Sequence, residues 1–346
     1  MDFGGKSLPR FSFLLAFVLA ATMQVESRLN VKPSKLVVFG DSYVDTGNTA
    51  KSNSSSWNKP YGVTFPGKPS GRFSDGRVWT DFIARSFGLK SPIPYMLSSA
   101  EKNQFRSGIN FAFGGTGIFN TSSPYPNMTA QIDIFEQLIR NRRYRPEDLA
   151  YSVALVAVSG NDHRKFLLDY GLTATIQEWE DFLQKVVNQT LHNVQRIHAL
   201  GVNKIAVDAL APLGCIPEIT SANAFTECDN KTNLLTQFYN QLLQVGISKL
   251  SDQMANASFV YIDLYAAFSA AMEKHVERFG GSQLKPCCVG MNASFSCGSV
   301  DDNGVNQYTV CERPNEKFFW DMVHPTQHGW RDVYLSLKST LRQLRV

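Results

Sequence analysis

Ser42 is the residue whose position in this sequence first suggests covalent chemistry. It lies in the segment GDSYVDTGN (40–48), directly after the apolar run LVVF (36–39). A serine between a buried strand and a helix can lie where backbone N–H groups and the positive end of the helix dipole stabilise an oxyanion. Alternatively, Ser42 only caps that helix, which is the commonest role of a serine at such a turn. The segment alone leaves both roles open.

A histidine and an aspartate near the C-terminus could activate this serine. A serine hydroxyl needs a base to remove its proton, and the base needs a supporting carboxylate. Of the six histidines, His324 fits best because Asp321 precedes it by three residues in the loop WDMVHPT (320–326), ahead of a predicted helix over about 327–341. An isolated Asp-x-x-His is commonly only a surface ion pair, worth about 0–1 kcal/mol. Pro325 and the apolar neighbours favour a fixed, partly buried loop.

Two further segments could donate hydrogen bonds to an oxyanion. The segment NFAFGGTG (110–117) is a glycine-rich turn whose backbone can approach a ligand closely. Asn161 follows the apolar run VALVAV (153–158) and adds a side-chain amide donor. Either segment on its own more commonly serves only the geometry of a turn. In combination with a serine, a histidine and an aspartate, they predict acyl transfer through a covalent intermediate.

The spacing of apolar residues predicts an α/β fold that positions these groups. Short β-rich runs alternate with windows of helical spacing: strands at 36–39, 109–111, 153–158, 205–210 and 259–264, and helices at 78–89, 132–142, 176–200 and 234–250. Continuous Val/Ile/Leu runs indicate a parallel sheet of about five strands, buried on both faces by helices. Ligands of such sheets gather beyond the carboxyl ends of the strands. Residues 48–74 are rich in Ser, Asn, Pro and Gly and predict a long surface excursion.

The N-terminus is typical of a secretory signal peptide. Lys6 and Arg10 precede a weakly polar to apolar run over 11–21 and a polar stretch that ends near Ser27. The run is shorter than the roughly 20 apolar residues that a membrane span needs. We therefore predict a signal peptide over 1–27 and one domain over 28–346, secreted or in the lumen of the secretory pathway, without stable membrane insertion.

The cysteines fit such an oxidising compartment. All six lie in the second half of the chain: Cys215, Cys228, Cys287, Cys288, Cys297 and Cys311. A zinc site made from them is disfavoured, because Cys287 and Cys288 are adjacent and no histidine follows at finger spacing. We expect one short loop closed by Cys215 and Cys228, with the other four cysteines cross-linking residues 285–311. The spacing itself does not determine the connectivity.

Composition and glycosylation sequons give information on the class of protein and on its surface. With 346 residues, 43% apolar and 18% charged, the chain is typical of globular proteins, and its formal charge of +4 carries no nucleic-acid signal. Seven Asn-x-Ser/Thr triplets predict surface glycans at some of these positions: Asn53, Asn120, Asn127, Asn188, Asn230, Asn256 and Asn292.

Several of these segments resemble the GDSL (SGNH) esterase/lipase family. The likeness rests on FGDS (39–42), GND (160–162) and DMVHP (321–325). Its plant branch is suggested by DTGN (45–48), PYG (60–62), GRFSDGR (71–77), PLGCIP (212–217) and KPCC (285–288). The chain departs from the family at Tyr43, where the name-giving leucine stands, and at Val289, where the plant branch usually has glycine. Because no Gly-x-Ser-x-Gly elbow is present, the α/β-hydrolase fold is disfavoured.

The resemblance implies a flavodoxin-like, three-layer α/β/α sandwich and a role for each site residue. It implies Ser42 as nucleophile, His324 as general base, Asp321 as the residue that orients it, and an oxyanion hole of Ser42, Gly115 and Asn161, with Gly114 as the alternative to Gly115.

We therefore expect a secreted serine esterase or lipase that hydrolyses acyl esters without cofactor or metal. Acylated cell-wall polysaccharides, lipids and small esters remain open as substrates. An acyltransferase with the same triad is one alternative, and a catalytically silent secreted binding or defence protein is another. The sequence does not specify an oligomeric state.

Overall fold

The computed structural model describes residues 1, 32–98, 105–158, 160–170 and 173–345. The signal peptide predicted over 1–27 lies outside this part of the chain, apart from Met1. Both that segment and the domain boundary at residue 28 therefore stay predictions.

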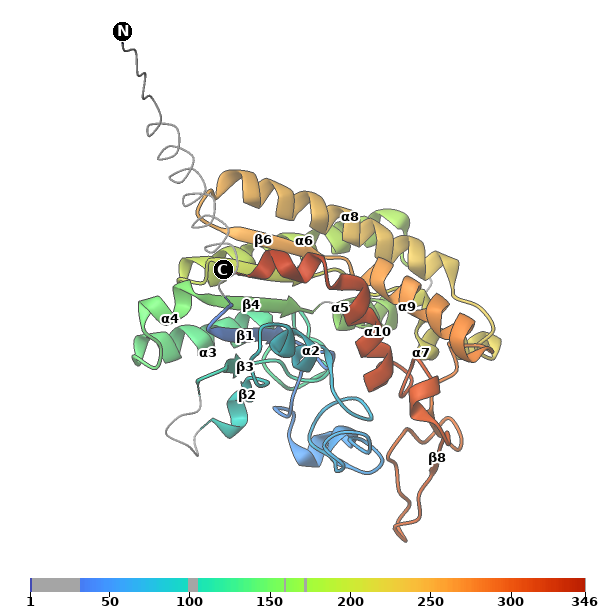
Figure 1. Ribbon diagram of the computed structural model, residues 1–346. Coiled ribbons are helices and arrows are strands. Elements are labelled where there is room, and N and C mark those ends of the chain that lie inside the picture. The colour runs from blue at the N-terminus through green and yellow to red at the C-terminus, as the bar shows by residue number, and fades with distance from the viewer. Residues whose placement is uncertain (2–31, 99–104, 159, 171–172, 346) are drawn as a thin grey trace.

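A six-stranded parallel sheet forms the centre of the molecule (Figure 1). Its strands are β1 (Lys35–Gly40), β2 (Ile93–Pro94), β3 (Gly108–Asn110), β4 (Ser152–Ala157), β5 (Lys204–Asp208) and β6 (Ser258–Ile262). Their spatial order is β2-β3-β1-β4-β5-β6. Without the short edge strand β2, this is the flavodoxin order. All five predicted strands are confirmed. The sixth, β2, was missed because it has only two residues and one of them is proline.

Alternation along β1 explains why the sheet is covered on both faces. Leu36 and Val38 point into one core cluster, and Val37 and Phe39 point into another. The first cluster is closed by α2 (Trp79–Ser86), α9 (Leu264–Phe279) and α10 (Gln327–Leu337). The second is closed by α3 (Met128–Arg140), α6 (Ile176–Ala199) and α8 (Asn230–Gln253). The three-layer α/β/α sandwich is therefore confirmed.

Of the long helices named above, α9 was not predicted from the sequence. The remaining elements are shorter. They are α4 (Pro146–Ala150), α5 (Gly160–Tyr170), α7 (Pro217–Thr220), the hairpin strands β7 (Cys288–Gly290) and β8 (Tyr308–Val310), and the 3₁₀ turns η1 (Lys51–Asn53), η2 (Ser55–Trp57), η3 (Tyr95–Leu97), η5 (Leu213–Cys215), η6 (Ser221–Asn223), η7 (Pro314–Glu316) and η8 (Thr340–Leu344).

The helix predicted directly after Ser42 is wrong. The chain makes a single turn there, in which the N–H groups of Val44 and Asp45 both donate to the Asp41 carbonyl, at 3.2 and 2.9 Å. The turn stops because the Asp45 carboxylate accepts the N–H groups of Gly47 and Asn48, at 2.7 Å each. Those groups would otherwise donate to helix carbonyls. Ser42 is therefore not a helix cap.

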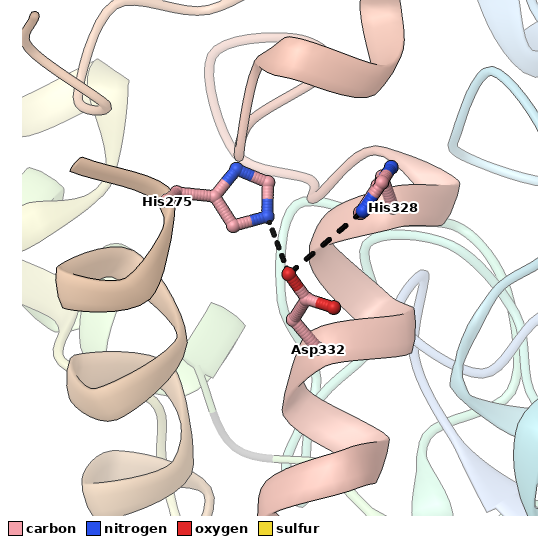
Figure 2. Close-up of side chains that lie close together, drawn as sticks. All are labelled: His275, His328 and Asp332. Atoms are coloured by element: carbon pink, nitrogen blue, oxygen red, sulfur yellow. Dashed lines mark ion pairs between the residues drawn. The ribbon is translucent and has the colours of Figure 1, made fainter. Parts of the chain in front are cut away.

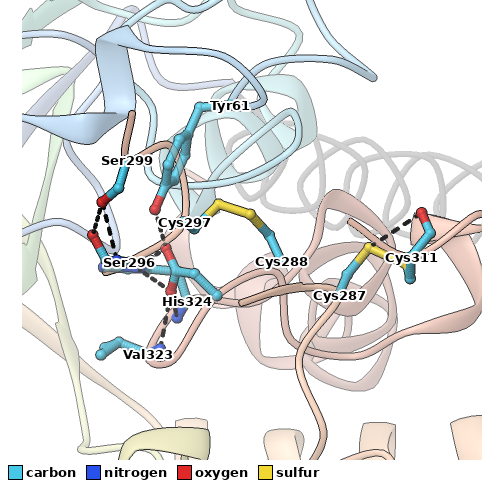
Figure 3. The surroundings of a disulfide bond; sticks show 10 residues. Tyr61, Cys287, Cys288, Ser296, Cys297, Ser299, Cys311, Val323 and His324 are labelled. Atoms are coloured by element: carbon cyan, nitrogen blue, oxygen red, sulfur yellow. Dashed lines mark hydrogen bonds and ion pairs between the residues drawn. A yellow bond between two sulfur atoms is a disulfide. The ribbon is translucent and has the colours of Figure 1, made fainter. Parts of the chain in front are cut away.

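Three disulfide bonds pair all six cysteines. Cys215–Cys228 closes the short loop that the sequence predicted, and Cys287–Cys311 and Cys288–Cys297 cross-link the C-terminal insertion. Figure 3 shows both of these bonds, with Tyr61 next to Cys288–Cys297. With Trp320, these groups form a small separate apolar cluster.

Surface features agree in part with the sequence reading. Among the described residues, no helix is long and apolar enough to cross a membrane. Six of the predicted glycan acceptors are exposed: Asn53, Asn120, Asn188, Asn230, Asn256 and Asn292. Asn127 is half-buried and caps α3, since its side chain accepts the Ala130 N–H at 3.0 Å.

Candidate active site

The sheet brings the predicted site segments to one edge. β1 lies between β3 and β4, and all three run in the same direction. Ser42, the glycine-rich turn after β3 and Asn161 after β4 therefore leave neighbouring strands at their carboxyl ends. At Gly40, a Cβ would lie 2.2 Å from the Ala157 carbonyl oxygen, so only glycine allows β1 to approach β4 this closely before the turn.

Ser42, His324 and Asp321 form one hydrogen-bonded line. His324 Nε2 lies 2.7 Å from Ser42 Oγ. On the other side of the ring, Nδ1 lies 2.8 and 2.9 Å from the two carboxylate oxygens of Asp321. Ser42 is only 7% exposed and Asp321 only 6%. The pair Asp321–His324 is therefore a buried structural contact and not a surface ion pair.

The loop that carries this pair is fixed by the carboxylate itself. Asp321 Oδ1 accepts the backbone N–H groups of Val323 and His324 at 2.9 and 2.8 Å. The His324 carbonyl in turn accepts the Trp320 N–H at 2.7 Å. Both the backbone and the side chain of His324 are thus hydrogen-bonded to Asp321.

Tyr61 is a site residue that the sequence reasoning missed. Its hydroxyl donates to Asp321 Oδ2 at 2.7 Å, and its ring packs edge-to-face on Trp320. Burial raises the pKa of Asp321, but the His324 charge and the hydrogen bonds from His324, Val323 and Tyr61 outweigh it and hold this pKa below its usual value. The only sequence signal for Tyr61 was its place in the PYG block of the family resemblance.

Tyr43, which stands in place of the family's name-giving leucine, packs against core aromatic residues beside the site. Its ring packs edge-to-face on Trp330, at 5.1 Å between centroids, and stacks on Phe268. Its hydroxyl donates to the Val323 carbonyl at 3.2 Å. Tyr43 therefore supports the loop that carries His324.

The three groups that the family resemblance implies as oxyanion-hole donors each keep an N–H without a close acceptor in the described part of the chain. Among the described residues, no group accepts the N–H of Ser42 or of Gly115. Gly115 has φ +77°, a conformation that glycine adopts without strain. The Asn161 side-chain amide donates to the Thr116 carbonyl at 2.9 Å, which leaves its second N–H only a long contact of 3.4 Å with Asp41.

Gly114 is a poorer donor to a ligand than Gly115. Its N–H already donates to Thr49 Oγ1 at 2.8 Å and lies 3.2 Å from Asp45 Oδ2. This pattern favours Gly115 of the two glycines.

Buried carboxylates organise the turns around these donors. Asp162 accepts the N–H groups of Ile118 and Phe119 at 2.8 and 2.9 Å, and burial raises its pKa to about 6. Asp41, next to Ser42, accepts the Tyr43 N–H at 3.0 Å. Burial raises the pKa of Asp41 to about 7, although the Tyr43 hydrogen bond and the His324 charge oppose the shift.

A pocket of about 340 Å³ opens beside Gly115 and Asn161. Phe73 connects it to the triad, because its ring lies 5.1 Å from the His324 ring. Seven of the sixteen residues that form the wall carry a hydroxyl group. The wall consists of Thr49, Asn53, Ser54, Ser55, Phe73, Gly114, Gly115, Thr121, Ser122, Ser123, Pro124, Tyr125, Asn161, Arg164, Lys165 and Leu168. Residues 48–74, predicted as a surface excursion, thus contribute one side of the pocket.

Residues 36–334 match the family model of the GDSL-like Lipase/Acylhydrolase. The chain belongs to this family. It is 50% identical to the GDSL esterase/lipase At5g03610 of Arabidopsis thaliana, over 90% of this chain and 87% of the relative. Identity is 47% with the GDSL esterase/lipase At3g09930 of the same plant, over 98% and 97% of the two chains. The family membership makes the chain a carboxylic ester hydrolase.

One further curated relative and two solved structures show weaker similarity. Acetylajmalan esterase 2 of Rauvolfia serpentina is 30% identical, over 92% of each chain. Among solved structures, LAE5, an alpha/beta hydrolase enzyme from the metagenome of Lake Arreo, matches at 13% identity over 92% of this chain and 100% of that one, with a TM-score of 0.43. Axe2, an acetylxylan esterase from Geobacillus stearothermophilus, matches at 12% identity over 91% and 96%, with a TM-score of 0.37.

The raised pKa of Asp41 predicts a pH-dependent stability that Asp41→Asn removes. Between pH 3.8 and about 7 the folded chain keeps a proton that the unfolded chain releases. The contribution of Asp41 to the free energy of unfolding therefore falls as pH rises through this window, by at most about 1.4 kcal/mol per pH unit. In urea unfolding, the stability of Asp41→Asn relative to the unmodified protein should rise between pH 4 and pH 8.

The exposed residue Asp302 provides the control, since Asp302→Asn should follow the pH profile of the unmodified protein. Parallel profiles for Asp41→Asn and the unmodified protein would contradict the prediction.

Proposed function

We propose that this esterase cleaves its substrates through an acyl-enzyme on Ser42. The hydrogen-bonded line from Ser42 Oγ through the His324 ring to Asp321 carries the proposal. In this arrangement His324 Nδ1–H donates to the carboxylate, so Nε2 is free to accept the serine proton. Asp321 holds the ring in the required tautomer and stabilises the imidazolium that forms.

The reaction follows in two balanced halves. Ser42 Oγ attacks the ester carbonyl carbon while His324 Nε2 takes the hydroxyl proton. Nε2 then returns this proton to the alkoxide oxygen as the C–O bond breaks, so an alcohol leaves and an acyl-serine remains. Water repeats the sequence on the acyl-serine, releases the carboxylic acid and restores Ser42.

The oxyanion of each tetrahedral intermediate would accept three hydrogen bonds. Ser42 and Gly115 offer backbone N–H groups that no described residue uses, and Asn161 offers its second amide N–H. Because these donors are fixed before substrate binds, they stabilise the transition state without reorganisation.

The pocket supports a polar ester of modest size as the substrate, with acylated carbohydrate as our preferred class. Ser54, Ser55, Thr121 and Ser122 bring hydroxyl groups to the wall, and Tyr125 adds an aromatic face. Hydroxyl groups of a sugar can exchange hydrogen bonds with such a wall.

Secretion is part of the proposal and is supported by two observations. The three disulfide bonds require an oxidising compartment to persist. The exposed positions of six sequons leave room for glycans on the folded protein.

Ser42→Ala tests the proposed nucleophile. We expect kcat/KM for p-nitrophenyl acetate to fall by about four to six orders of magnitude, since a serine triad without its nucleophile retains only residual activity. Ser251→Ala, an exposed serine on α8, should behave like the unmodified protein. Retention of full activity by Ser42→Ala would refute the mechanism.

Tyr61→Phe tests the support of Asp321. The substitution keeps the ring but removes a hydrogen bond to a buried carboxylate, a contact worth about 1.5–3 kcal/mol. We expect kcat to fall by roughly 10- to 100-fold with little change in KM, because Tyr61 acts through the triad and not on substrate.

Tyr308→Phe is the matched control, because Tyr308 packs on the same apolar cluster without a hydrogen bond to Asp321. Equal kcat values for both variants would show that the Tyr61 hydroxyl has no positioning role.

A series of acyl chain lengths tests the proposed substrate class. A pocket that buried an alkyl chain would gain about 0.8 kcal/mol per methylene. With the hydroxyl-rich wall we expect no such gain, so kcat/KM should be highest for acetyl or butyryl esters and for acetylated oligosaccharides. A steady rise from p-nitrophenyl acetate to the palmitate would argue for a lipid substrate instead.

A further inference from the structure

A cluster of two histidines and an aspartate lies outside the proposed triad. His275 comes from α9, and His328 and Asp332 come from successive turns of α10 (Figure 2). His275 Nε2 lies 3.0 Å from Asp332 Oδ2, and His328 Nε2 lies 3.9 Å from the same oxygen. One nitrogen or oxygen atom from each side chain lies within 4.8 Å of the others.

His275 is completely buried, and in the part of the chain that the structure describes one of its two ring nitrogens lacks a hydrogen-bond partner. Its side chain is 0% exposed. Nδ1 has no partner among the described residues, and the partner of Nε2 is the Asp332 carboxylate at 3.0 Å. Buried polar atoms normally have partners, because an unsatisfied one loses the hydrogen bond that water would provide. A metal ion bound by Nε2 would take the place of the proton that this nitrogen shares with Asp332.

We propose that His275, His328 and Asp332 bind a divalent transition metal ion, with Zn²⁺ as the preferred ion. Two imidazoles and one carboxylate are a donor set typical of zinc, whereas Mg²⁺ and Ca²⁺ prefer oxygen ligands. With bond lengths of about 2.0–2.1 Å, ligand atoms of a tetrahedral zinc site lie about 3.3 Å apart. The cluster reaches this spacing by a small inward rotation of His328, whose side chain is 18% exposed. Water can complete the coordination from that side.

Arg331 is the group that opposes binding. Its guanidinium nitrogen lies 3.3 Å from His328 Nε2, so it must move before this nitrogen can coordinate an ion. The side chain is exposed and can turn into solvent. The same cation also repels a metal ion, so its removal should increase affinity.

A metal at this place would join α9 to the first turns of α10. α10 is capped by Thr326, only two residues after His324. The ion would therefore brace the segment that carries His324 without touching Ser42. This inference does not depend on the proposed mechanism.

Zinc titration of the purified, untagged and chelator-treated protein tests the site. We expect one equivalent of Zn²⁺ to bind in equilibrium dialysis with elemental analysis, and an excess of Mg²⁺ not to displace it. His328→Ala and Asp332→Asn should each weaken binding more than about tenfold, a larger loss than changes outside the ligand set usually cause. Arg331→Gln should strengthen binding.

His192→Ala is the matched control, since it removes an exposed histidine of α6 and should leave the affinity unchanged. Ester hydrolysis and circular dichroism establish that each variant is folded. The proposal is overturned if the unmodified protein binds no zinc, or if both His328→Ala and Asp332→Asn bind it like His192→Ala.

Discussion

The buried carboxylate of Asp321 is the group on which the site depends. Its two oxygens accept the Val323 and His324 N–H groups, the His324 ring and the Tyr61 hydroxyl. A buried carboxylate without such partners would take up a proton, because burial penalises the charged form. Here the His324 charge and the hydrogen bonds outweigh the effect of burial, and the pKa of Asp321 stays below its usual value. The same bonds fix the loop that presents His324 to Ser42.

The disulfide-bonded insertion, residues 285–311, supports the segment that carries Asp321. The N–H groups of Cys287 and Cys288 donate to the carbonyls of Phe319 and Trp320, at 3.0 and 2.6 Å. The segment that contains the adjacent cysteines is thus hydrogen-bonded to the segment leading directly into Asp321. Tyr61 packs in the same apolar cluster. Two segments far apart in the sequence therefore hold one acidic group in place.

The sequence predicted what local pattern controls and missed what tertiary contacts control. β1 and β4 are continuous apolar runs, and the spacing of Asp321 and His324 already implied a shared loop. The helix after Ser42 was wrong because the Asp45 side chain captures backbone N–H groups that propensity assigns to a helix. Tyr61 was missed because its hydrogen-bond partner, Asp321, lies on a distant segment. His275 was missed because α9 was not predicted, so nothing in the sequence was a reason to place it near His328.

Two buried acids, Asp41 and Asp162, lie at the carboxyl edge of the sheet, and their charge affects the proposed chemistry. Asp41 and Asp162 lie beside the donors that face the pocket, and burial raises both pKa values towards neutrality. Negative charge there disfavours an oxyanion but favours the imidazolium that His324 becomes during proton transfer. Asp162 accepts hydrogen bonds from the N–H groups of Ile118 and Phe119, which oppose the rise of its pKa. In the proposed mechanism the oxyanion would face the N–H groups of Ser42 and Gly115, while the imidazolium would face Asp321. This separation of the two charges is what the proposed mechanism requires of the fold.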